Sequence, residues 1–350
     1  MNILFIINHL NAGGAEKILT VVANSFSKKN HKITIAKVSH DESFYVLEKE
    51  INILHIVNKN HKPLDLIFGI KSTISEIQPD IIISFGTTMN IYSIIASKFS
   101  SVPIIVSEHT NFHRAKNEFW RKLRRLFYPF TDMLIVLTEY DYNKYDYVRN
   151  VKQIYNPLEL SSRHVDIKRE KIILAVGRLH KVKGFDLLLK AFANIDNSEW
   201  RLLILGDGQE RSNLELLAKE LKIDQRVSMP GIIKDIELYY KKASIFVLSS
   251  RAEGFPGALC EAMGYGCPSI AFNCISGPNE IINDNFDGIL VEPENVKELA
   301  KQIKNLQNNP VKRIQFSKNG KKIIERLNTN TITNKWLDHI ISIINKGNLK

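Results

Sequence analysis

Short, almost uninterrupted apolar runs alternate along this chain with longer segments in which apolar residues recur at helical spacing. The short runs are rich in Ile, Val and Leu, as in parallel strands that are buried on both faces, and the longer segments have the period of amphipathic helices. The first half contains the runs NILFII, KITIAKV, DIIISFG, PIIVSEH and MLIVLT, and the second half contains KIILAVG, RLLILGDG, SIFVLSS, PSIAFN and GILVEP. The pattern therefore predicts an α/β fold in which one strand–helix rhythm occurs twice.

The repeated rhythm and the chain length both predict two domains. At 350 residues the chain exceeds the roughly 250 to 300 residues that a single core usually serves. The segment 155–170, YNPLELSSRHVDIKRE, has the Asn-Pro, serine and mixed-charge composition of a linker. We expect domains over residues 1–160 and 161–330, with a ligand cleft at the carboxyl ends of their strands. Segment 331–350 predicts an amphipathic helix that packs back on the first domain, through Trp336, Leu337, Ile340, Ile341 and Ile344.

Composition narrows the class of protein further. A hydrophobic share of 44% and a charged share of 24% are ordinary for a soluble globular protein. The N-terminal apolar run is broken at Asn8 and His9, which favours a buried strand over a signal peptide, and no run is long enough for a membrane-spanning helix. The three cysteines lack CxxC spacing, which favours reduced packing residues over a disulfide or zinc site. We therefore expect a cytoplasmic protein.

The net charge of +11 indicates an anionic partner, and one segment carries much of it in the first half of the chain. Residues 114–125 hold six basic residues and one acidic residue. Around them, apolar residues recur at helical spacing with cations between them: Trp120, Leu123, Leu126, Phe127 and Phe130, interleaved with Arg121, Lys122, Arg124 and Arg125. A basic amphipathic helix with aromatic residues favours binding to an anionic membrane surface. The alternative is a core-packed helix with a solvated basic face, and no motif supports nucleic-acid binding.

The stretch VLSSRAEGFPGALCEAMGYG contains two carboxylates eight positions apart. A strand is expected to end near Ser249, and a helix to begin near Gly257 after a Gly/Pro turn. The free N–H groups of that helix start suit an anion or sugar hydroxyls. Glu253 would lie at the turn, and Glu261 on the helix would lean back toward it, so both would reach one hydroxyl-rich ligand such as a nucleotide sugar. The alternative is that Glu253 caps the helix and Glu261 is solvated.

A basic loop follows the strand of AVGRLHKVKGFDLLLKAF, before a helix expected from about Asp186. Its cations, Arg178 and Lys183, can neutralise a diphosphate and stabilise it as it leaves. A merely solvated loop is the alternative.

Further candidates follow other predicted strands. Gly13 and Gly14 open the first helix and allow close approach of a phosphate, while Glu16 in its first turn fits either a role in the site or simple compensation of the helix dipole. His109 lies at the expected cleft edge, although a lone histidine is commonly structural. Gly206 in LGDGQER and Ile232 in MPGII are candidates for contact with a ribose or a base.

Taken together, these motifs resemble the retaining family 4 glycosyltransferases, which have the GT-B fold of two Rossmann-like domains facing each other across a cleft. The motifs are the Glu-x7-Glu element in EGFPGALCEAMGYGCPSIAFNCISGPNEII, the loop GRLHKVKG and the early GGAEK. The resemblance implies that the first domain binds the acceptor and the second binds the nucleotide sugar. Glu261 would bind the ribose, and Glu253 the hydroxyls of the donor sugar.

The same resemblance implies roles for the remaining candidates. The backbone of the turn would assist Glu253, through Gly254, Phe255, Pro256 and Gly257. Arg178 and Lys183 would hold the diphosphate, Gly14 would approach the phosphate or the acceptor, and His109 would lie near the reacting sugar. Attack from the same face as the leaving group is the expected route to retention, because no carboxylate is left over to act as a nucleophile. No metal or other cofactor is expected, since Asp-x-Asp is absent and two cations offset the charge.

Within that family, ISFGTTMN, VSEHTNF and RKLRRLFYPFTDMLIVLT look similar to bacterial enzymes that extend lipid-linked oligosaccharides, including N-acetylgalactosamine transferases of lipopolysaccharide and O-antigen assembly. This implies transfer of a hexose or N-acetylhexosamine from a UDP-sugar to a polyprenyl-diphosphate-linked glycan, by a peripheral protein on the inner face of the cell membrane. Two alternatives stay open. One is a nucleotide-sugar 2-epimerase, and the other is a non-catalytic protein that binds nucleotide sugars or nucleic acid.

Overall fold

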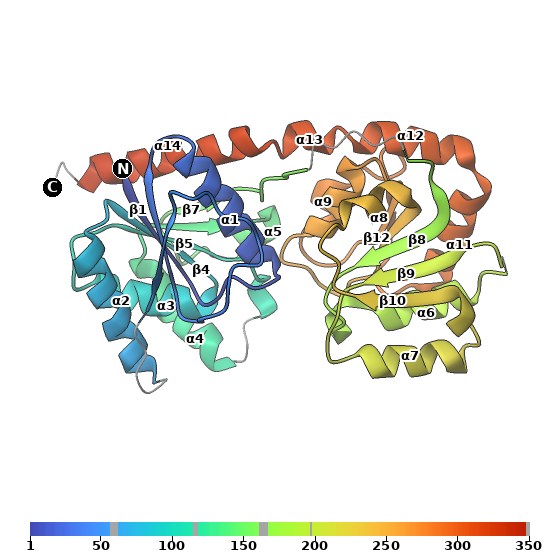
Figure 1. Ribbon diagram of the computed structural model, residues 1–350, viewed down its shortest axis with the longest axis horizontal. Helices are drawn as coiled ribbons and strands as arrows, with labels where there is room; N and C mark the ends of the chain where they lie inside the picture. The colour runs from blue at the N-terminus through green and yellow to red at the C-terminus, as the bar shows by residue number, and fades with distance from the viewer. Residues whose placement is uncertain (57–61, 115–117, 161–166, 197, 348–350) are drawn as a thin grey trace. The chain divides into compact units, whose positions relative to one another are not determined.

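The computed structural model describes residues 1–56, 62–114, 118–160, 167–196 and 198–347, and these form two compact α/β units (Figure 1). Unit 1 comprises Met1–Glu159 together with Leu327–Lys350, and unit 2 comprises Leu160–Arg326. The boundary falls inside the segment expected to be a linker, of which residues 161–166 lie outside the described part of the chain.

Unit 1 is built on a parallel sheet with the strand order β3-β2-β1-β4-β5-β6-β7. The strands are β1 (Asn2–Ile7), β2 (Lys32–Lys37), β3 (Asn52–His55), β4 (Ile81–Phe85), β5 (Ile104–Ser107), β6 (Met133–Val136) and β7 (Val151–Gln153). The sequence pattern missed β3 and β7, because these short edge strands lack a buried apolar run.

Helices cover both faces of this sheet, as its apolar strands require. They are α1 (Gly14–Ser27), α2 (Pro63–Ile77), α3 (Thr87–Ser97), α4 (Glu118–Phe127), α5 (Glu139–Tyr142) and α14 (Thr329–Gly347). Alternate residues of β1 point to opposite faces. Phe5 packs with α1 and α14, whereas Leu4 packs with α2 and α3.

The C-terminal helix α14 completes the core of unit 1 (Figure 1). Trp336 is 2% exposed, and its ring stacks on Phe85 of β4 with 6.1 Å between centroids. Ile332 and Ile340 are buried beside it. The buried stripe differs from the predicted one near its end: Ile341 is exposed and Ile344 half-buried, whereas Ile343, which was not predicted, is buried.

Unit 2 has a parallel sheet with the order β10-β9-β8-β11-β12-β13. Its strands are β8 (Glu170–Val176), β9 (Arg201–Leu205), β10 (Val227–Gly231), β11 (Ala243–Leu248), β12 (Ser269–Phe272) and β13 (Ile289–Val291). Its helices are α6 (Phe185–Ala193), α7 (Arg211–Glu220), α8 (Glu237–Lys242), α9 (Gly257–Gly264), α10 (Pro278–Ile281), α11 (Val296–Asn308), α12 (Pro310–Gly320) and α13 (Ile323–Arg326).

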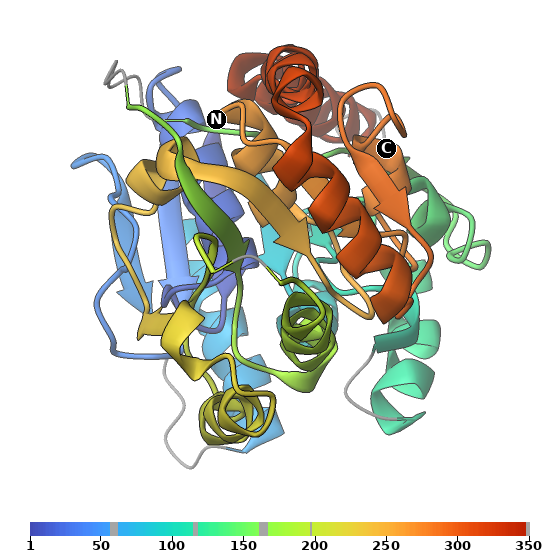
Figure 2. The ribbon, with the colours of Figure 1, turned by 90° about the vertical axis from the view of Figure 1, so that its right-hand side faces the viewer.

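The helices of unit 2 pack on both faces of its sheet, and Figure 2 turns this unit toward the viewer. Residues of α6, α7 and α11 share one apolar core with the strands, and α8 and α9 contact β8, β11 and β12. All ten runs predicted from the apolar pattern are strands of one sheet or the other. In each unit the loops that follow the strands' carboxyl ends gather at one edge of the sheet, and these loops carry the predicted site residues.

Candidate active site

In unit 2, backbone hydrogen bonds connect the loop after β8 to the loop after β9. The backbone N–H of Gly177 donates to Leu205 O at 2.9 Å, and Leu179 N–H donates to Asp207 O at 2.9 Å. Gly206 has a φ of +140°, and a Cβ there would lie 2.0 Å from the carbonyl oxygen of Gly177. Gly206 is therefore required for the packing of these loops, whatever ligand it contacts.

Lys183, in the loop after β8, forms an ion pair with Glu253, in the loop after β11. The Lys183 Nζ atom lies 2.7 and 2.9 Å from the two carboxylate oxygens of Glu253, and Ser250 Oγ also donates to that carboxylate. Glu253 is 6% exposed, so the ammonium offsets a charge that would otherwise be costly to bury. Glu253 does not cap α9, because Pro256 occupies the N-cap position without a side-chain hydrogen bond.

A second ion pair, missed in the sequence, holds the loop after β11 against the loop after β8. The Arg251 guanidinium donates to both oxygens of Asp186 at 2.8 and 2.7 Å, and to Lys181 O at 2.6 Å. Burial alone would raise the pKa of Asp186, but the hydrogen bonds and charge of Arg251 outweigh it and lower that pKa. The signals available in the sequence were an arginine two residues before Glu253 and an acidic residue, Asp186, in the first turn of the helix after the basic loop.

Glu261 lies on α9, which begins at Gly257 as predicted, and its partner comes from α8. The buried Tyr240 hydroxyl donates to Glu261 Oε2 at 2.9 Å, and the Tyr240 ring stacks on Tyr265. Burial, and then the charge of Glu261, raise the pKa of Tyr240 well above its usual value, so the phenol remains a donor. Half-buried and hydrogen-bonded, Glu261 is not simply solvated. The two carboxylates are thus held by different partners.

The turn between the two carboxylates is partly open. Gly254, Phe255 and Gly257 are half-buried, Pro256 is buried, and a Cβ at Gly257 would meet nothing within 4 Å. The backbone there has room for a ligand.

Arg178 and Ile232 are the exposed members of the predicted set in unit 2. Among the residues that the structure describes, the Arg178 guanidinium forms no hydrogen bond or ion pair. Arg178 is not part of the Lys183–Glu253 cluster. Ile232 follows β10 with 59% of its surface exposed.

In unit 1, Gly13 and Gly14 lie where the first helix begins. Gly13 is extended and Gly14 is the first residue of α1, with open space where its Cβ would be. Glu16 lies 3.2 Å from Nδ1 of His9, so its carboxylate also has a local partner.

His109 follows β5 at the carboxyl edge of the unit 1 sheet. Its ring stacks on Phe85 with 5.0 Å between centroids, and Nε2 lies 3.0 Å from Ser107 Oγ. Burial lowers the pKa of His109 to about 3, so the imidazole is neutral near pH 7. A neutral ring beside this sheet edge can exchange hydrogen bonds with a sugar without carrying a charge.

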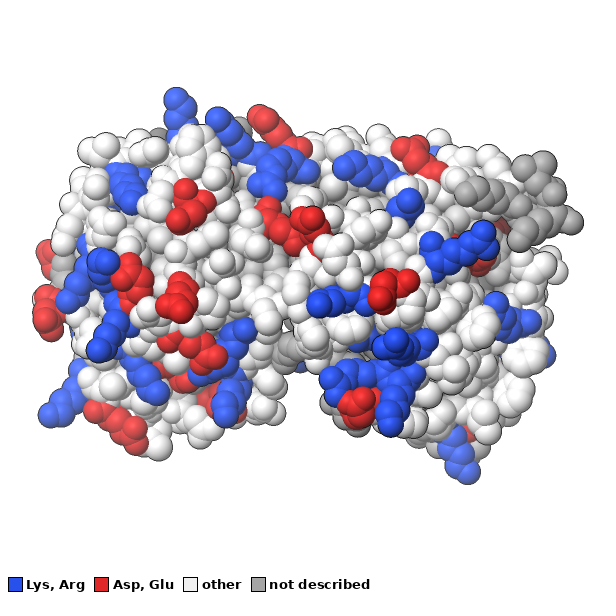
Figure 3. Space-filling view, turned by 180° about the vertical axis from the view of Figure 1, so that it is seen from behind, with Lys and Arg blue, Asp and Glu red and all other residues white. Residues whose placement is uncertain are grey.

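The basic segment forms α4, but its faces differ from the prediction. Arg121, Lys122 and Arg125 are exposed, and Figure 3 shows positive side chains gathering over this region of unit 1. The prediction that Arg124 belongs to the exposed basic set is wrong, because its side chain is 1% exposed. Its position follows from the helical period: Arg124 shares with Trp120 and Phe127 the inner face of α4, which packs toward α3 and the apolar cluster on this side of unit 1. Leu126 and Phe130 are exposed instead.

Comparison with known proteins identifies the class. Residues 12–162 match the family described as Glycosyltransferase Family 4, and residues 159–323 match the family described as Glycosyl transferases group 1. The chain belongs to the family 4 glycosyltransferases, as the sequence resemblance implied, and it is a glycosyltransferase rather than an epimerase or a binding protein.

One relative is similar to this protein along nearly the whole chain. It is the GalNAc-α-(1→4)-GalNAc-α-(1→3)-diNAcBac-PP-undecaprenol α-1,4-N-acetyl-D-galactosaminyltransferase of Campylobacter jejuni, which is 33% identical over 99% of both chains.

Solved structures share the fold. Sucrose-phosphate synthase from Thermosynechococcus elongatus superposes with a TM-score of 0.86 at 18% identity over 99% of both chains. Anabaena HepE, solved with UDP and glucose, superposes with a TM-score of 0.85 at 21% identity over 98% of this chain and 100% of HepE. These likenesses confirm the predicted GT-B class, with two Rossmann-like units. Within the described ranges, no helix is both long and apolar enough to cross a membrane.

Proposed function

We propose that this enzyme transfers an N-acetylhexosamine or hexose from a UDP-sugar to a polyprenyl-diphosphate-linked glycan, with retention of configuration and without a metal ion. The observation that carries the proposal is the similarity to the Campylobacter jejuni enzyme along 99% of both chains, because the name of that enzyme specifies a glycan on undecaprenyl diphosphate. The product would belong to a bacterial surface polysaccharide or glycan.

Unit 2 is the proposed donor site. An ammonium has three N–H donors, and Glu253 occupies two of those of Lys183, which leaves one for a phosphate oxygen. Arg178, exposed and without a partner among the described residues, adds the second cation for the diphosphate. Glu261, oriented by Tyr240, would accept from the ribose hydroxyls. The peptide groups of residues 254–257, with Gly206 and Ile232, would contact the sugar, the phosphates and the base.

The chemical step needs little from the protein beyond position and charge. The acceptor oxygen forms a bond to the anomeric carbon while the bond from that carbon to the phosphate oxygen breaks. The acceptor's proton goes to an oxygen of the departing diphosphate, on the same face of the sugar. Arg178 and Lys183 would stabilise the charge that develops on that diphosphate. His109, neutral and close to the sheet edge, would hydrogen-bond the reacting sugar.

Unit 1 is the proposed site of the lipid-linked acceptor, on a membrane surface. The exposed cations Arg121, Lys122 and Arg125 share α4 with the exposed apolar side chains of Phe119 and Leu126. Cations attract anionic headgroups and apolar side chains enter the interface, so together they suit the inner face of a cell membrane.

The test is a transfer assay with UDP-GalNAc, UDP-GlcNAc and UDP-glucose, and with GalNAc-α-linked undecaprenyl diphosphate in anionic vesicles. We expect lipid-extractable product with an α-linkage by NMR, formed equally well in excess EDTA. Lys183→Ala and Arg178→Ala should each lower turnover about 100- to 1,000-fold, because each removes a charge that stabilises the leaving group. Lys181→Ala is the matched control, since its exposed side chain forms no hydrogen bond or ion pair among the described residues.

Two outcomes would contradict the proposal. Consumption of a UDP-sugar with no acceptor present, and with a 2-epimer as the product, would favour epimerase chemistry. Full turnover by both charge-removal variants would exclude the assigned diphosphate site.

A further inference from the structure

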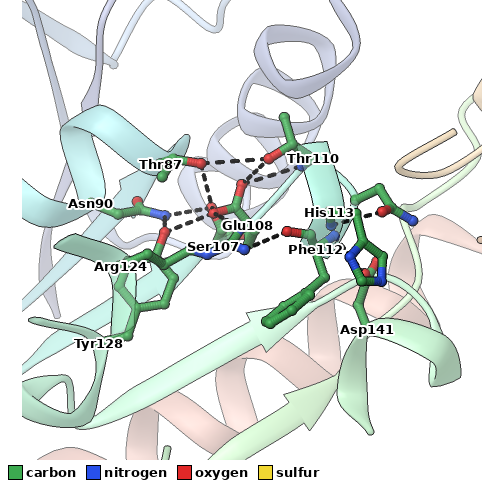
Figure 4. Close-up of polar contacts among 11 residues, drawn as sticks. Thr87, Asn90, Ser107, Glu108, Thr110, Phe112, His113, Arg124, Tyr128 and Asp141 are labelled. Atoms are coloured by element: carbon green, nitrogen blue, oxygen red, sulfur yellow. Dashed lines mark hydrogen bonds and ion pairs between the residues drawn. The ribbon is translucent and has the colours of Figure 1, made fainter. Parts of the chain in front are cut away.

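A buried carboxylate that has no role so far lies directly beside His109. Glu108, 3% exposed, follows β5 and accepts four hydrogen bonds (Figure 4). Three come from hydroxyls: Thr87 Oγ1 at 2.8 Å, Tyr128 Oη at 2.7 Å and Thr110 Oγ1 at 2.6 Å. The fourth comes from the backbone N–H of Thr110 at 3.2 Å. The buried guanidinium of Arg124 lies 3.9 Å away and offsets the charge.

This carboxylate is fixed in place by its surroundings. Asn90 Nδ2 donates to the carbonyl of Ser107 at 3.0 Å and to the Tyr128 hydroxyl at 3.2 Å, so Tyr128 must direct its own proton to Glu108. Arg124 is fixed in turn by a hydrogen bond to Phe112 O and by its position over the Phe112 ring. Glu108 therefore has no freedom to turn away from the two threonines.

The hydroxyl protons of Thr87 and Thr110 are both donated to Glu108. A carboxylate oxygen only accepts hydrogen bonds, and a hydroxyl has one proton to donate. Because Glu108 takes the protons of Thr87 and Thr110, each threonine oxygen presents only lone pairs elsewhere. The two oxygens are 3.5 Å apart. Thr110 is exposed and Thr87 is half-buried at the start of α3, so both are at the surface of the sheet edge that carries His109.

We propose that Thr87 and Thr110, polarised by Glu108, form a subsite that accepts a hydrogen bond from a hydroxyl of the glycan substrate. This rests on the proposed function, in which unit 1 binds that glycan. The group bound is not the reacting hydroxyl, because in the proposed step that hydroxyl gives its proton to the departing diphosphate and needs no second acceptor. It is a neighbouring group on the same terminal sugar, and Glu108 is a positioning residue.

The subsite is tested with steady-state kinetics on the full-length enzyme at saturating UDP-sugar. The probe is GalNAc-α-linked undecaprenyl diphosphate, together with its 3-, 4- and 6-deoxyfluoro analogues, which keep the size of a hydroxyl and lose its proton. Thr87→Val and Thr110→Val should each raise the KM for the glycan about 5- to 10-fold, with kcat and the KM for the donor within about twofold. Thr87→Ser and Thr110→Ser keep the oxygen and should retain the KM of the wild-type enzyme.

The analogues locate the bound group. One deoxyfluoro analogue should bind the wild-type enzyme about 5- to 10-fold more weakly than the parent, and Thr110→Val should abolish that difference because the partner oxygen is gone. Glu108→Gln replaces one carboxylate oxygen by an amide that donates, which turns a threonine proton outward. This variant should also lose the discrimination, and the threonine variants decide the matter if it fails to fold.

The failures are distinguishable. If the wild-type enzyme transfers sugar to the parent probe and both valine variants keep its KM, the subsite is overturned while the proposed function stands. If serine and valine variants are equally impaired, the threonine methyl packing matters and the subsite is again overturned. If the wild-type enzyme does not use a lipid-linked glycan at all, the proposed acceptor fails and the subsite fails with it.

Discussion

At the scale of single residues, most of the proposed site groups are positioned by a neighbour of complementary chemistry, and Arg178 is the exception among the described residues. Lys183 offsets the buried charge of Glu253, Tyr240 donates to Glu261, and Ser107 contacts the ring of His109. An unpaired charge or polar group at these depths would cost stability, so the partners are as much a part of the site as the groups themselves.

His109 should give the enzyme a measurable dependence of stability on pH. Its pKa is lowered from 6.5 to about 3 in the folded state, so below pH 6.5 the unfolded state binds a proton that the folded state does not. The free energy of unfolding should therefore decrease as the pH falls from 6.5 toward 3. Urea unfolding across this range should show a shallower decrease for His109→Gln than for the wild-type protein. Equal slopes for the wild-type protein and His109→Gln would contradict this assignment.

Tyr240→Phe tests whether the orientation of Glu261 matters for the donor. Removal of the hydroxyl leaves Glu261 Oε2 without this donor, which should cost about 1 kcal/mol of stability and weaken UDP binding about 3- to 10-fold. Tyr239→Phe, half-buried on the same helix, is the matched control. Calorimetric titration with UDP measures both variants, and unchanged affinity in Tyr240→Phe would show that Glu261 does not need this partner.

At the scale of elements, α4 carries cations on two faces, one exposed to solvent and one buried. Arg121, Lys122 and Arg125 are solvated, whereas Arg124 lies in the core between the Phe112 and Tyr145 rings, near Glu108. Solvated charges contribute little to stability but act on distant anions. Removal of a buried charge, by contrast, strongly lowers stability, because it leaves the buried partner charge uncompensated.

The two faces should therefore separate in experiment. Replacement of Arg121, Lys122 and Arg125 by Gln should reduce sedimentation with anionic vesicles about 10-fold or more, since each cation contributes about 1 kcal/mol near such a surface, and should leave thermal stability nearly unchanged. Arg124→Met should instead lower the free energy of unfolding by about 3 kcal/mol. Vesicle binding that survives the triple substitution would assign α4 to packing alone.

At the scale of the whole molecule, two separate cores predict two cooperative transitions. Unit 1 is completed by α14, and unit 2 has a core of its own. A ligand stabilises only the part that it binds, so UDP at about 100 times its Kd should raise the stability of unit 2 by about 2.7 kcal/mol and leave unit 1 unchanged. Scanning calorimetry of the wild-type protein and of Trp336→Ala, which weakens unit 1, identifies each transition. A UDP-induced shift of the transition that Trp336→Ala lowers would place the nucleotide in the wrong unit.

The sequence by itself determined the elements and the class of enzyme. Buried parallel strands need continuous apolar runs, so ten of the strands and their repeated rhythm were visible as local patterns. The Gly/Pro turn likewise marked the start of α9 at Gly257. The Glu-x7-Glu element and the basic loop were also local, and they carried the resemblance that the comparisons confirmed.

The tertiary structure decided which side chains have partners. Lys183 and Glu253 are 70 residues apart, and Glu108 meets Thr87 and Arg124 only because their elements pack together. The local pattern placed Arg124 with the solvated cations, because charge is read along the chain whereas burial depends on which face of α4 packs inward. Pairings of this kind depend on the three-dimensional register of distant segments, which the order of residues does not display.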